Sequence, residues 1–476
     1  MSVSNIRIFL LQPSSPRFMY IQKLTDALSA WLAYVDRNRW LFPLLLVLIT
    51  GIHFSTLTIS PAYWQDEMQI IEHGRVMLNP NTEYSMNWSI GEDRPINTEP
   101  FYLLKVIQET IFIHFDNSVA ATRSAVLLGA LAAAFAVYAF FRKYGFSFLL
   151  AASLAVMLIC DPLLVQSFKG GRVDVYLMGA FFSSLTCFVI AIQEKSKISY
   201  CCMFLSGFIL GVTPLMWPSA ILLYPLFAYV LYKFISTEST QYSRQKKTLL
   251  GVFLIGAITS FFVFFYAAYD SIWGTLTEFV EEMNLGRNSN KSVELNLAQF
   301  ESTLVIFLKS PLLLFMGITG ILVSRSWVLF ACFLTTWFMC VFTGIYVYRV
   351  IYLIPYLLLG IALLMQHTKT PRFTQIAGLR RFLIVPALIW AVAVSCLARP
   401  FVAYSSIDSR NYAQMDDNPV SEKIGKTDSV FLEPWELYPM VRKKQWKIYR
   451  PYHETKFLKD SQSYEVQKFN ERLDWL

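Results

Sequence analysis

The stretch VYLMGAFFSSLTCFVIAI, residues 175–192, carries no charged side chain. A helix that crosses a bilayer needs about 20 mostly apolar residues, and this stretch has that character. About 11 stretches of the chain are of this kind, and together they predict an all-α polytopic membrane protein. They lie at residues 41–59, 120–141, 147–165, 175–192, 199–215, 218–234, 248–268, 303–323, 327–344, 350–365 and 382–398.

The composition of the whole chain agrees with this prediction. Of the 476 residues, 55% are hydrophobic and 16% are charged, whereas a soluble domain has about 25% charged residues. This excludes a disordered chain, a coiled coil and a protein that binds nucleic acid through a basic face. The net charge of +8 fits a membrane protein, because loops on the inner side collect Lys and Arg. The seven cysteines lie in or beside apolar stretches and have no disulfide or zinc-site spacing.

Basic residues between the spans give the orientation. With the N-terminus inside, the short inner segments are basic, as the positive-inside rule requires. Their basic residues are Arg142, Lys143, Lys195, Lys197, Arg325 and those within 244–247 and 369–381. This predicts an inner segment 1–40, a membrane domain 41–398 and an outer C-terminal segment 399–476. Large outer loops at 60–119 and 269–302 place the function on the outer face.

The first outer loop opens with the acidic pair Asp66-Glu67. Apolar side chains within residues 64–76 have helical spacing, which predicts a helix on the membrane surface. Asp66 and His73 then face a different side. A carboxylate held there could act as a general base on an acceptor hydroxyl, or it could orient a metal or a sugar. The alternative is a solvated acidic loop, because Glu99 and other acidic residues are near in the sequence.

A second cluster, KGGRVD at residues 169–174, follows the third span. Cations beside glycines suit a phosphate, because the backbone can approach it and Lys169 and Arg172 can neutralise it. Asp174 enters the fourth span, where a carboxylate is costly and usually has a role or a partner. The alternative is an Arg172–Asp174 ion pair that caps the helix.

Arg349 opens the tenth span and could meet an anionic headgroup. The sequence has no Walker loop, no Gly-x-Gly-x-x-Gly and no His-Glu-x-x-His, so no nucleotide site or zinc protease site is visible. Ionisable residues are nearly absent from the span centres, where transporters place them.

Four motifs together resemble the GT-C superfamily of polytopic glycosyltransferases. The nearest likeness is family 39, with the protein O-mannosyltransferases and the lipid A aminoarabinose transferases. The motifs are Asp66-Glu67, EPFYLL at 99–104, GRVDVYL at 171–177, and Arg349 with YLIP at 352–355. The resemblance covers about residues 41–364.

The resemblance implies a GT-C fold and a sugar transferred, with inversion, from a polyisoprenyl phosphate in the outer leaflet. The acceptor would be a lipid, glycan or protein outside the cytoplasm. It implies that Asp66 is the base or the carboxylate that orients the acceptor, and that Glu67 assists it. Lys169, Arg172 and Arg349 would bind the phosphate, and Asp174 would orient the donor or a divalent cation. The possible acceptor or loop contacts are His73 and Glu99. The compartment among membrane lipids depends on the host: the inner membrane with the site facing the periplasm in a bacterium, or the endoplasmic reticulum with a lumenal site in a eukaryote. The short loops favour the bacterial inner membrane.

The chain departs from this family at residues 97–100. Close relatives often have a double proline there, sometimes preceded by Lys or His, whereas this chain has Asn-Thr-Glu-Pro. A donor-binding cation is therefore absent or supplied elsewhere. Two other functions stay open: a transporter or lipid flippase, and a non-catalytic membrane scaffold. Convergence of the clusters at 66–67 and 169–174 would argue against the scaffold.

Overall fold

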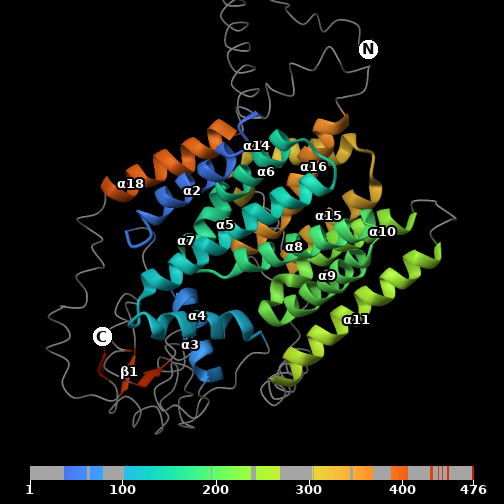
Figure 1. Ribbon diagram of the computed structural model, residues 1–476. Helices are drawn as coiled ribbons and strands as arrows, with labels where there is room; N and C mark the ends of the chain where they lie inside the picture. Colours follow the sequence, from blue (N-terminus) through green and yellow to red (C-terminus); the bar gives the residue numbers. More distant parts are fainter. Residues whose placement is uncertain are drawn as a thin grey trace, which may run out of the picture.

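The computed structural model (Figure 1) describes a helical bundle with a short sheet near the C-terminus. The described residues are 37–59, 61, 65–78, 101–194, 196–236, 243–267, 303, 305–342, 347–367, 388–405, 429–431, 438, 442, 447–449 and 474–475.

Most of these residues are helical, which confirms the predicted fold class. The first half of the bundle contains α2 (Leu41–Phe54), α3 (Gln65–Leu78), α4 (Leu103–His114), α5 (Val119–Lys143), α6 (Phe148–Ile159), α7 (Pro162–Lys169), α8 (Asp174–Gln193) and α9 (Lys197–Met216). The second half contains η2 (Pro218–Leu223), α10 (Tyr224–Ser236), α11 (Ser243–Ala267), α14 (Pro311–Val323), α15 (Trp327–Phe342), η4 (Val347–Leu353), α16 (Ile354–His367), η6 (Ala393–Ala398) and α18 (Arg399–Ser405).

Apolar helices occupy all the predicted span positions. Within the described residues, seven helices are long and apolar enough to cross a membrane, or eight if the bent pair α6–α7 is one span. Three shorter apolar helices, Leu41–Phe54, Pro311–Val323 and Trp327–Val341, lie at the other predicted positions. The number of crossings, about 11, stays a prediction.

The predicted third span is not one straight helix. It breaks after Ile159, and the axes of α6 and α7 differ by 52°. The Asp161 carboxylate accepts hydrogen bonds from the backbone of Leu163 and Leu164, and Pro162 takes the first helical position. An Asp N-cap followed by Pro is a strong helix start, so the Asp-Pro pair ends one helix and begins another.

Three other predicted boundaries shift. The helix of the first span ends at Phe54, and turns follow as far as Ile59. The eighth span has its helix from Pro311, which again suits a first helical position. The last helix runs through Ser405, so the predicted domain boundary at 398–399 falls inside it.

Glycines bring two helix pairs into backbone contact. A Cβ atom on Gly320 of α14 would collide with the backbone oxygen of Gly360 in α16, and one on Gly207 of α9 would collide with that of Phe253 in α11. Small residues allow such close approach in membrane helices, where packing replaces the hydrophobic effect as the driving force.

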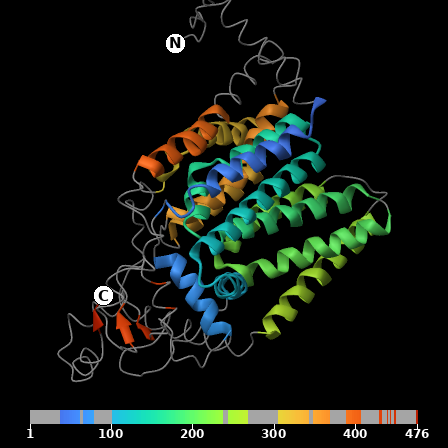
Figure 2. The same ribbon diagram turned by 60° about the vertical axis from the view of Figure 1, so that its left-hand side comes forward.

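The outer surface of the bundle is apolar. The helix α11, drawn in yellow-green at the edge of the bundle in Figures 1 and 2, exposes several large apolar side chains. They are Leu254, Ile255, Ile258, Phe262 and Val263. An apolar surface of this kind needs a nonpolar surrounding, which agrees with a helix that faces lipid.

The helices α3 and α4 lie together at one end of the bundle, on the side of the short sheet (Figures 1 and 2). The prediction that the apolar side of α3 lies on the membrane surface is wrong: Met68 and Ile71 are 0% and 1% exposed. Ile70 packs with Leu104, Val173 and Met216, so the helix buries apolar side chains within the protein. The sheet adds a small β element to the predicted all-helical chain. Its strand order is β2-β1-β3, and both pairings are parallel, with β1 at Ser429–Phe431, β2 at Lys447–Tyr449 and β3 at Asp474–Trp475.

The glycine contacts predict a specific loss of stability. Gly320→Ala places a methyl group against the Gly360 carbonyl and should lower the free energy of unfolding by about 1–3 kcal/mol, the usual cost of overpacking. Thermal unfolding in detergent micelles measures this. Gly251→Ala is the matched control, because no atom lies within 4 Å of its Cβ position. Equal melting temperatures for the two variants would contradict the α14–α16 contact.

Candidate functional site

The acidic pair 66–67 and the basic segment 169–174 meet at one end of the bundle. Gly171 has a φ of +69°, a conformation that suits glycine. A Cβ atom on Gly171 would lie only 2.7 Å from Cδ of Glu67. The segment therefore fits against this carboxylate only because residue 171 has no side chain, and the two predicted clusters are in contact at Glu67 and Gly171.

Glu67 forms a buried ion pair with Arg123 at the start of α5. Nε of Arg123 donates to Oε1 of Glu67 over 2.8 Å, and Nη2 donates to Oε2 over 2.7 Å. Nη1 donates to the backbone oxygens of Leu57 and Pro61. The two charged side chains are 0% and 1% exposed. Glu67 is therefore held in place by a bidentate contact, which suits a role in positioning α3 better than direct assistance to the reaction.

Asp66 lies next to Glu67 in the first turn of α3. Its backbone belongs to the described helix, whereas its side chain lies outside the described part of the chain. The Glu67–Arg123 pair fixes the helix one residue away, so it also fixes the backbone from which the Asp66 carboxylate extends. The catalytic assignment of Asp66 stays a prediction.

Asp174 joins three segments of the chain. Its Oδ2 accepts hydrogen bonds from Nε of Arg172 over 2.9 Å and from Oγ of Ser167 over 3.1 Å. Its Oδ1 accepts from the hydroxyl of Tyr352 in η4 over 2.5 Å. The ion pair with Arg172 is the capping alternative that the sequence left open, and Asp174 is the first residue of α8, where a negative charge is favoured. Asp174 thus orients Arg172.

Two cations lie near the same indole ring. The guanidinium carbon of Arg172 lies 5.9 Å from the centroid of Trp217, and Nζ of Lys105 lies 5.7 Å from it. Both distances are within the range of cation–π attraction. Lys105 comes from α4 and is 2% exposed, and Trp217 is the single residue between α9 and η2. This concentrates positive charge beside a flat apolar surface.

Lys169 points to another part of the structure. Its Nζ donates to Oγ1 of Thr56, in the turn after α2, whereas Arg172 faces Trp217. Close to this contact lies His53, whose ring packs against Phe168 with centroids 5.2 Å apart. The predicted phosphate-binding set is therefore divided, with Lys169 on the α2 side and Arg172 on the α9–η2 side.

Arg349 lies on η4 and is half-buried. Its backbone oxygen accepts a hydrogen bond from Sγ of Cys340. Side chains three residues apart eclipse one another in a 3₁₀-helix, so Arg349 shares a side of η4 with Tyr352, which contacts Asp174. The predicted role of Arg349 on the phosphate stays a prediction.

His73 lies within α3, and its Nδ1 is 3.1 Å from Nζ of Lys105. An ammonium group only donates, so Nδ1 accepts in this contact. Glu99 lies outside the described residues. Within the described part of the chain, no group of three or more His, Cys, Asp and Glu side chains could hold a metal ion. Asp174 has both oxygens bonded to protein groups, so a cation would have to compete with them.

The sequence prediction missed Lys105, Arg123 and Trp217. Arg123 falls inside the predicted second span, and an ionisable residue there is a usable signal. Lys105 belongs to a group of three polar residues on α4, with Gln108 and Glu109, and each of the three is at most 2% exposed. Their spacing of three and four residues marks one side of a helix. For Trp217 we find no signal, because tryptophan is common at any membrane interface.

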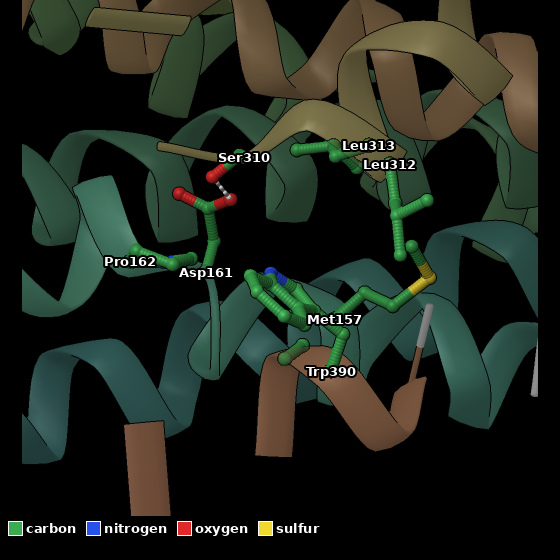
Figure 3. Close-up of a pocket in the computed structure, with 8 residues that line it drawn as sticks. Met157, Asp161, Pro162, Ser310, Leu312, Leu313 and Trp390 are labelled. Atoms are coloured by element: carbon green, nitrogen blue, oxygen red, sulfur yellow. Dashed lines mark hydrogen bonds between the residues drawn. The ribbon is translucent and has the colours of Figure 1, made fainter. Parts of the chain in front are cut away.

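Figure 3 shows a small cavity between α6, α14 and the last helix. The Asp161 carboxylate lies on one side, where Oγ of Ser310 donates to it over 2.6 Å. Apolar side chains such as Met157, Leu312 and Trp390 surround the rest. The cavity offers about 20 Å³, enough for about one water molecule, so it is not the substrate site.

Solved structures share this fold. The crystal structure of ArnT from Cupriavidus metallidurans bound to undecaprenyl phosphate matches with a TM-score of 0.55 and 14% identity, over 92% of this chain and 89% of that chain. The apo structure matches with a TM-score of 0.52 and 14% identity, over 90% and 92%. The S. cerevisiae Pmt1-Pmt2 complex bound to the sugar donor has a TM-score of 0.40 and 15% identity, over 51% and 36%, and supports no argument. No protein-family model and no curated protein matches the sequence.

An identity of 14% over nearly the whole of both chains establishes the fold alone. The chain has the polytopic fold of ArnT, which confirms the fold that the resemblance implied. Together with the apolar helices, the fold makes this an integral, multi-pass membrane protein.

The buried ion pair predicts a strong effect of Arg123→Met. The substitution leaves the Glu67 carboxylate buried without its partner, so the free energy of unfolding should fall by about 3–5 kcal/mol. Unfolding of the purified protein in mixed micelles measures this loss.

The double variant Arg123→Met with Glu67→Leu removes both charges and should recover much of the loss, because well-packed apolar residues can replace a buried pair. Arg325→Met is the control for a loss of one arginine, because Arg325 is exposed. If the double variant were no more stable than Arg123→Met, the unpaired Glu67 would not be the cause.

Proposed function

We propose that the protein is a membrane glycosyltransferase that moves a sugar from a polyisoprenyl-phosphate donor to an extracytoplasmic lipid, glycan or protein acceptor, with inversion. One observation carries the proposal. Lys105 and Arg172 place two buried cations around Trp217, at the same end of the bundle as the helix that carries Asp66. The fold of ArnT supports it, because one of the matching structures is bound to undecaprenyl phosphate.

The charges suit a reaction in which phosphate leaves. The acceptor oxygen attacks the anomeric carbon of the sugar while its proton passes to the Asp66 carboxylate. The bond from that carbon to the phosphate oxygen breaks, and the electron pair stays with the phosphate. Attack from the opposite side inverts the anomeric centre. Preorganised cations that meet the developing charge are an effective means of lowering such a barrier, and Lys105 and Arg172 supply them.

The other site residues support these groups. Glu67 fixes the first turn of α3 through Arg123, and Asp174 orients Arg172. We assign Lys105 to the place of the donor-binding cation that the sequence lacks at residues 97–100. Arg349 and Lys169 remain candidates for the phosphate or its lipid tail, and His73 and Glu99 for the acceptor. By the positive-inside rule the site faces outward, which in a bacterium is the periplasm.

A transporter or flippase is the alternative function. It would need polar groups along a path through the membrane. In the described helices most of the buried charged groups instead gather near the end that holds Glu67, Lys105, Arg123, Arg172 and Asp174, and Asp161 at the α6–α7 break is an exception. This distribution favours a site at one face over a path.

Mass spectrometry of lipid-linked and surface glycans tests the proposal. We compare cells with the native gene, a deletion, and Asp66→Asn at equal protein level. We expect one sugar mass to disappear in both the deletion and Asp66→Asn, because the acceptor hydroxyl loses its base. If the deletion alone removes the sugar, the enzyme assignment stands and the role of Asp66 is wrong. If neither strain changes any glycan, the transferase proposal is wrong.

Purified protein tests the two cations. Lys105→Gln and Arg172→Gln should each raise the KM for the lipid-linked sugar about tenfold or more, because a hydrogen bond to a charged group contributes about 1.5–3 kcal/mol. Lys247→Gln and Arg325→Gln are the matched controls, since both positions are exposed. An unchanged KM in the Lys105 and Arg172 variants would place the phosphate elsewhere.

A further inference from the structure

Two residues of the C-terminal segment are buried against α3 and α4. The hydroxyl of Tyr438 donates to Oε2 of Glu72 over 2.5 Å. Nη2 of Arg442 donates to Oε1 of Glu109 over 2.6 Å, and Nη1 lies 3.3 Å from Oε2 of Glu72. Arg442 and Tyr438 also flank Phe112, at 5.1 Å and 5.9 Å from its ring centroid. The contact thus combines hydrogen bonds, charge and ring packing.

The two carboxylates come from different helices. Glu72 belongs to α3 and Glu109 to α4, and their exposed fractions are 0% and 2%. Burial raises the pKa of Glu109, and the nearby Glu72 raises it further, whereas Arg442 and, by a smaller effect, Arg75 of α3 lower it. Burial opposes the charge on Arg442, but Tyr438, Glu72 and Glu109 outweigh this effect and raise its pKa. Arg442 is therefore a permanent cation that holds two like charges together.

The same two helices carry the groups of the proposed reaction. Asp66 and Glu72 lie on α3, while Lys105 and Glu109 are one helical turn apart on α4. The helices are in close contact at Lys105, because a Cβ atom on Gly74, two residues after Glu72, would lie 2.6 Å from the backbone carbon of Lys105. The spacing between α3 and α4 therefore sets the spacing between the proposed base and a proposed phosphate ligand.

The anchors of α3 are arranged in series. Arg123 of α5 holds Glu67 near the beginning of the helix, and Arg442 holds Glu72 five residues later, about 7.5 Å along the axis. Arg75, on the same helix, also pairs with Glu72. Without Arg442, the described contacts still fix the first turn of α3, but the pairing of Glu72 with α4 is lost.

We propose that Arg442, together with Tyr438, is a positioning residue for the transfer reaction: the C-terminal segment locks α3 onto α4 and thereby sets the Asp66 carboxylate relative to the Lys105 cation. The role of these contacts in positioning Asp66 and Lys105 for the reaction rests on the proposed function. The claim that Arg442 and Tyr438 hold α3 against α4 does not depend on that function, and it is tested separately.

Hydrogen exchange of the purified full-length protein tests the docking. In Arg442→Gln we expect amides of α3 beyond its first turn, and of α4, to exchange at least about tenfold faster than in the wild type, because two buried carboxylates then repel each other. Tyr438→Phe, which keeps the ring and loses one hydroxyl, should have a smaller effect in the same peptides. Arg325→Gln is the control. Unchanged exchange in Arg442→Gln would overturn the inference.

Enzyme kinetics test the positioning. We expect kcat of Arg442→Gln to fall about tenfold or more, since small misplacements of reacting groups are costly. The loss of kcat should grow as the pH rises. Without Arg442 the pKa of Glu109, which burial already raises, rises further. At low pH Glu109 is then protonated and does not repel Glu72, whereas at high pH Glu109 is ionised and the repulsion returns. Adding Glu109→Gln should restore kcat and remove this pH dependence. A general loss of structure would show neither effect.

The outcomes are distinguishable. Faster exchange with an unchanged kcat would overturn the positioning role. A kcat that falls but is not restored by Glu109→Gln would overturn the electrostatic mechanism. If the wild type transfers no sugar while Arg442→Gln still exchanges faster, the proposed function fails and the docking of the C-terminal segment stands.

Discussion

The end of the bundle that holds α3 depends on one buried guanidinium. Buried backbone carbonyl groups need hydrogen-bond donors, and Arg123 donates to those of Leu57 and Pro61 in the segment after α2. With its other nitrogens it holds both oxygens of Glu67. In a low-dielectric surrounding such contacts are strong, and leaving any of these groups unpaired is costly. Gly171 then packs directly on the Glu67 carboxylate, so the segment that carries Arg172 takes its place from the same ion pair.

The cations of the site are fixed by segments that are rigid for different reasons. Arg172 is oriented by Asp174, which is itself held by Ser167 and Tyr352. Trp217 lies at a junction where α9 ends and η2 begins with no loop between them. A charged group needs little reorganisation when its supports are already bonded, and this is the condition under which electrostatic stabilisation is most effective. The arrangement therefore suits a fixed receptor for an anion better than a flexible one.

Sequence reasoning predicted the helical membrane fold and a helix within residues 64–76, because hydropathy and charge are local properties of the sequence. It placed the two clusters on one face and left their convergence to the structure. It did not predict the break at Asp161-Pro162, since overall hydropathy hides a capping signal. It could not foresee the partners of Glu67 or the direction of Lys169, because these depend on which helices are neighbours. The pairing of Arg442 with Glu72 and Glu109 joins segments too distant in sequence for any periodicity to indicate.

That distance has a consequence for how the protein is made. Tyr438 lies 366 residues after Glu72 in the chain, so a ribosome that adds about 5–20 residues per second needs roughly 20 to 70 s between the two. During this interval the membrane helices can assemble, but Glu72 and Glu109 have no Arg442 to separate their charges. The α3–α4 pair thus reaches its final state only when almost the whole chain has been synthesised. A nascent chain, or one that stops before residue 442, would hold the membrane helices without the Arg442 contacts that join α3 to α4.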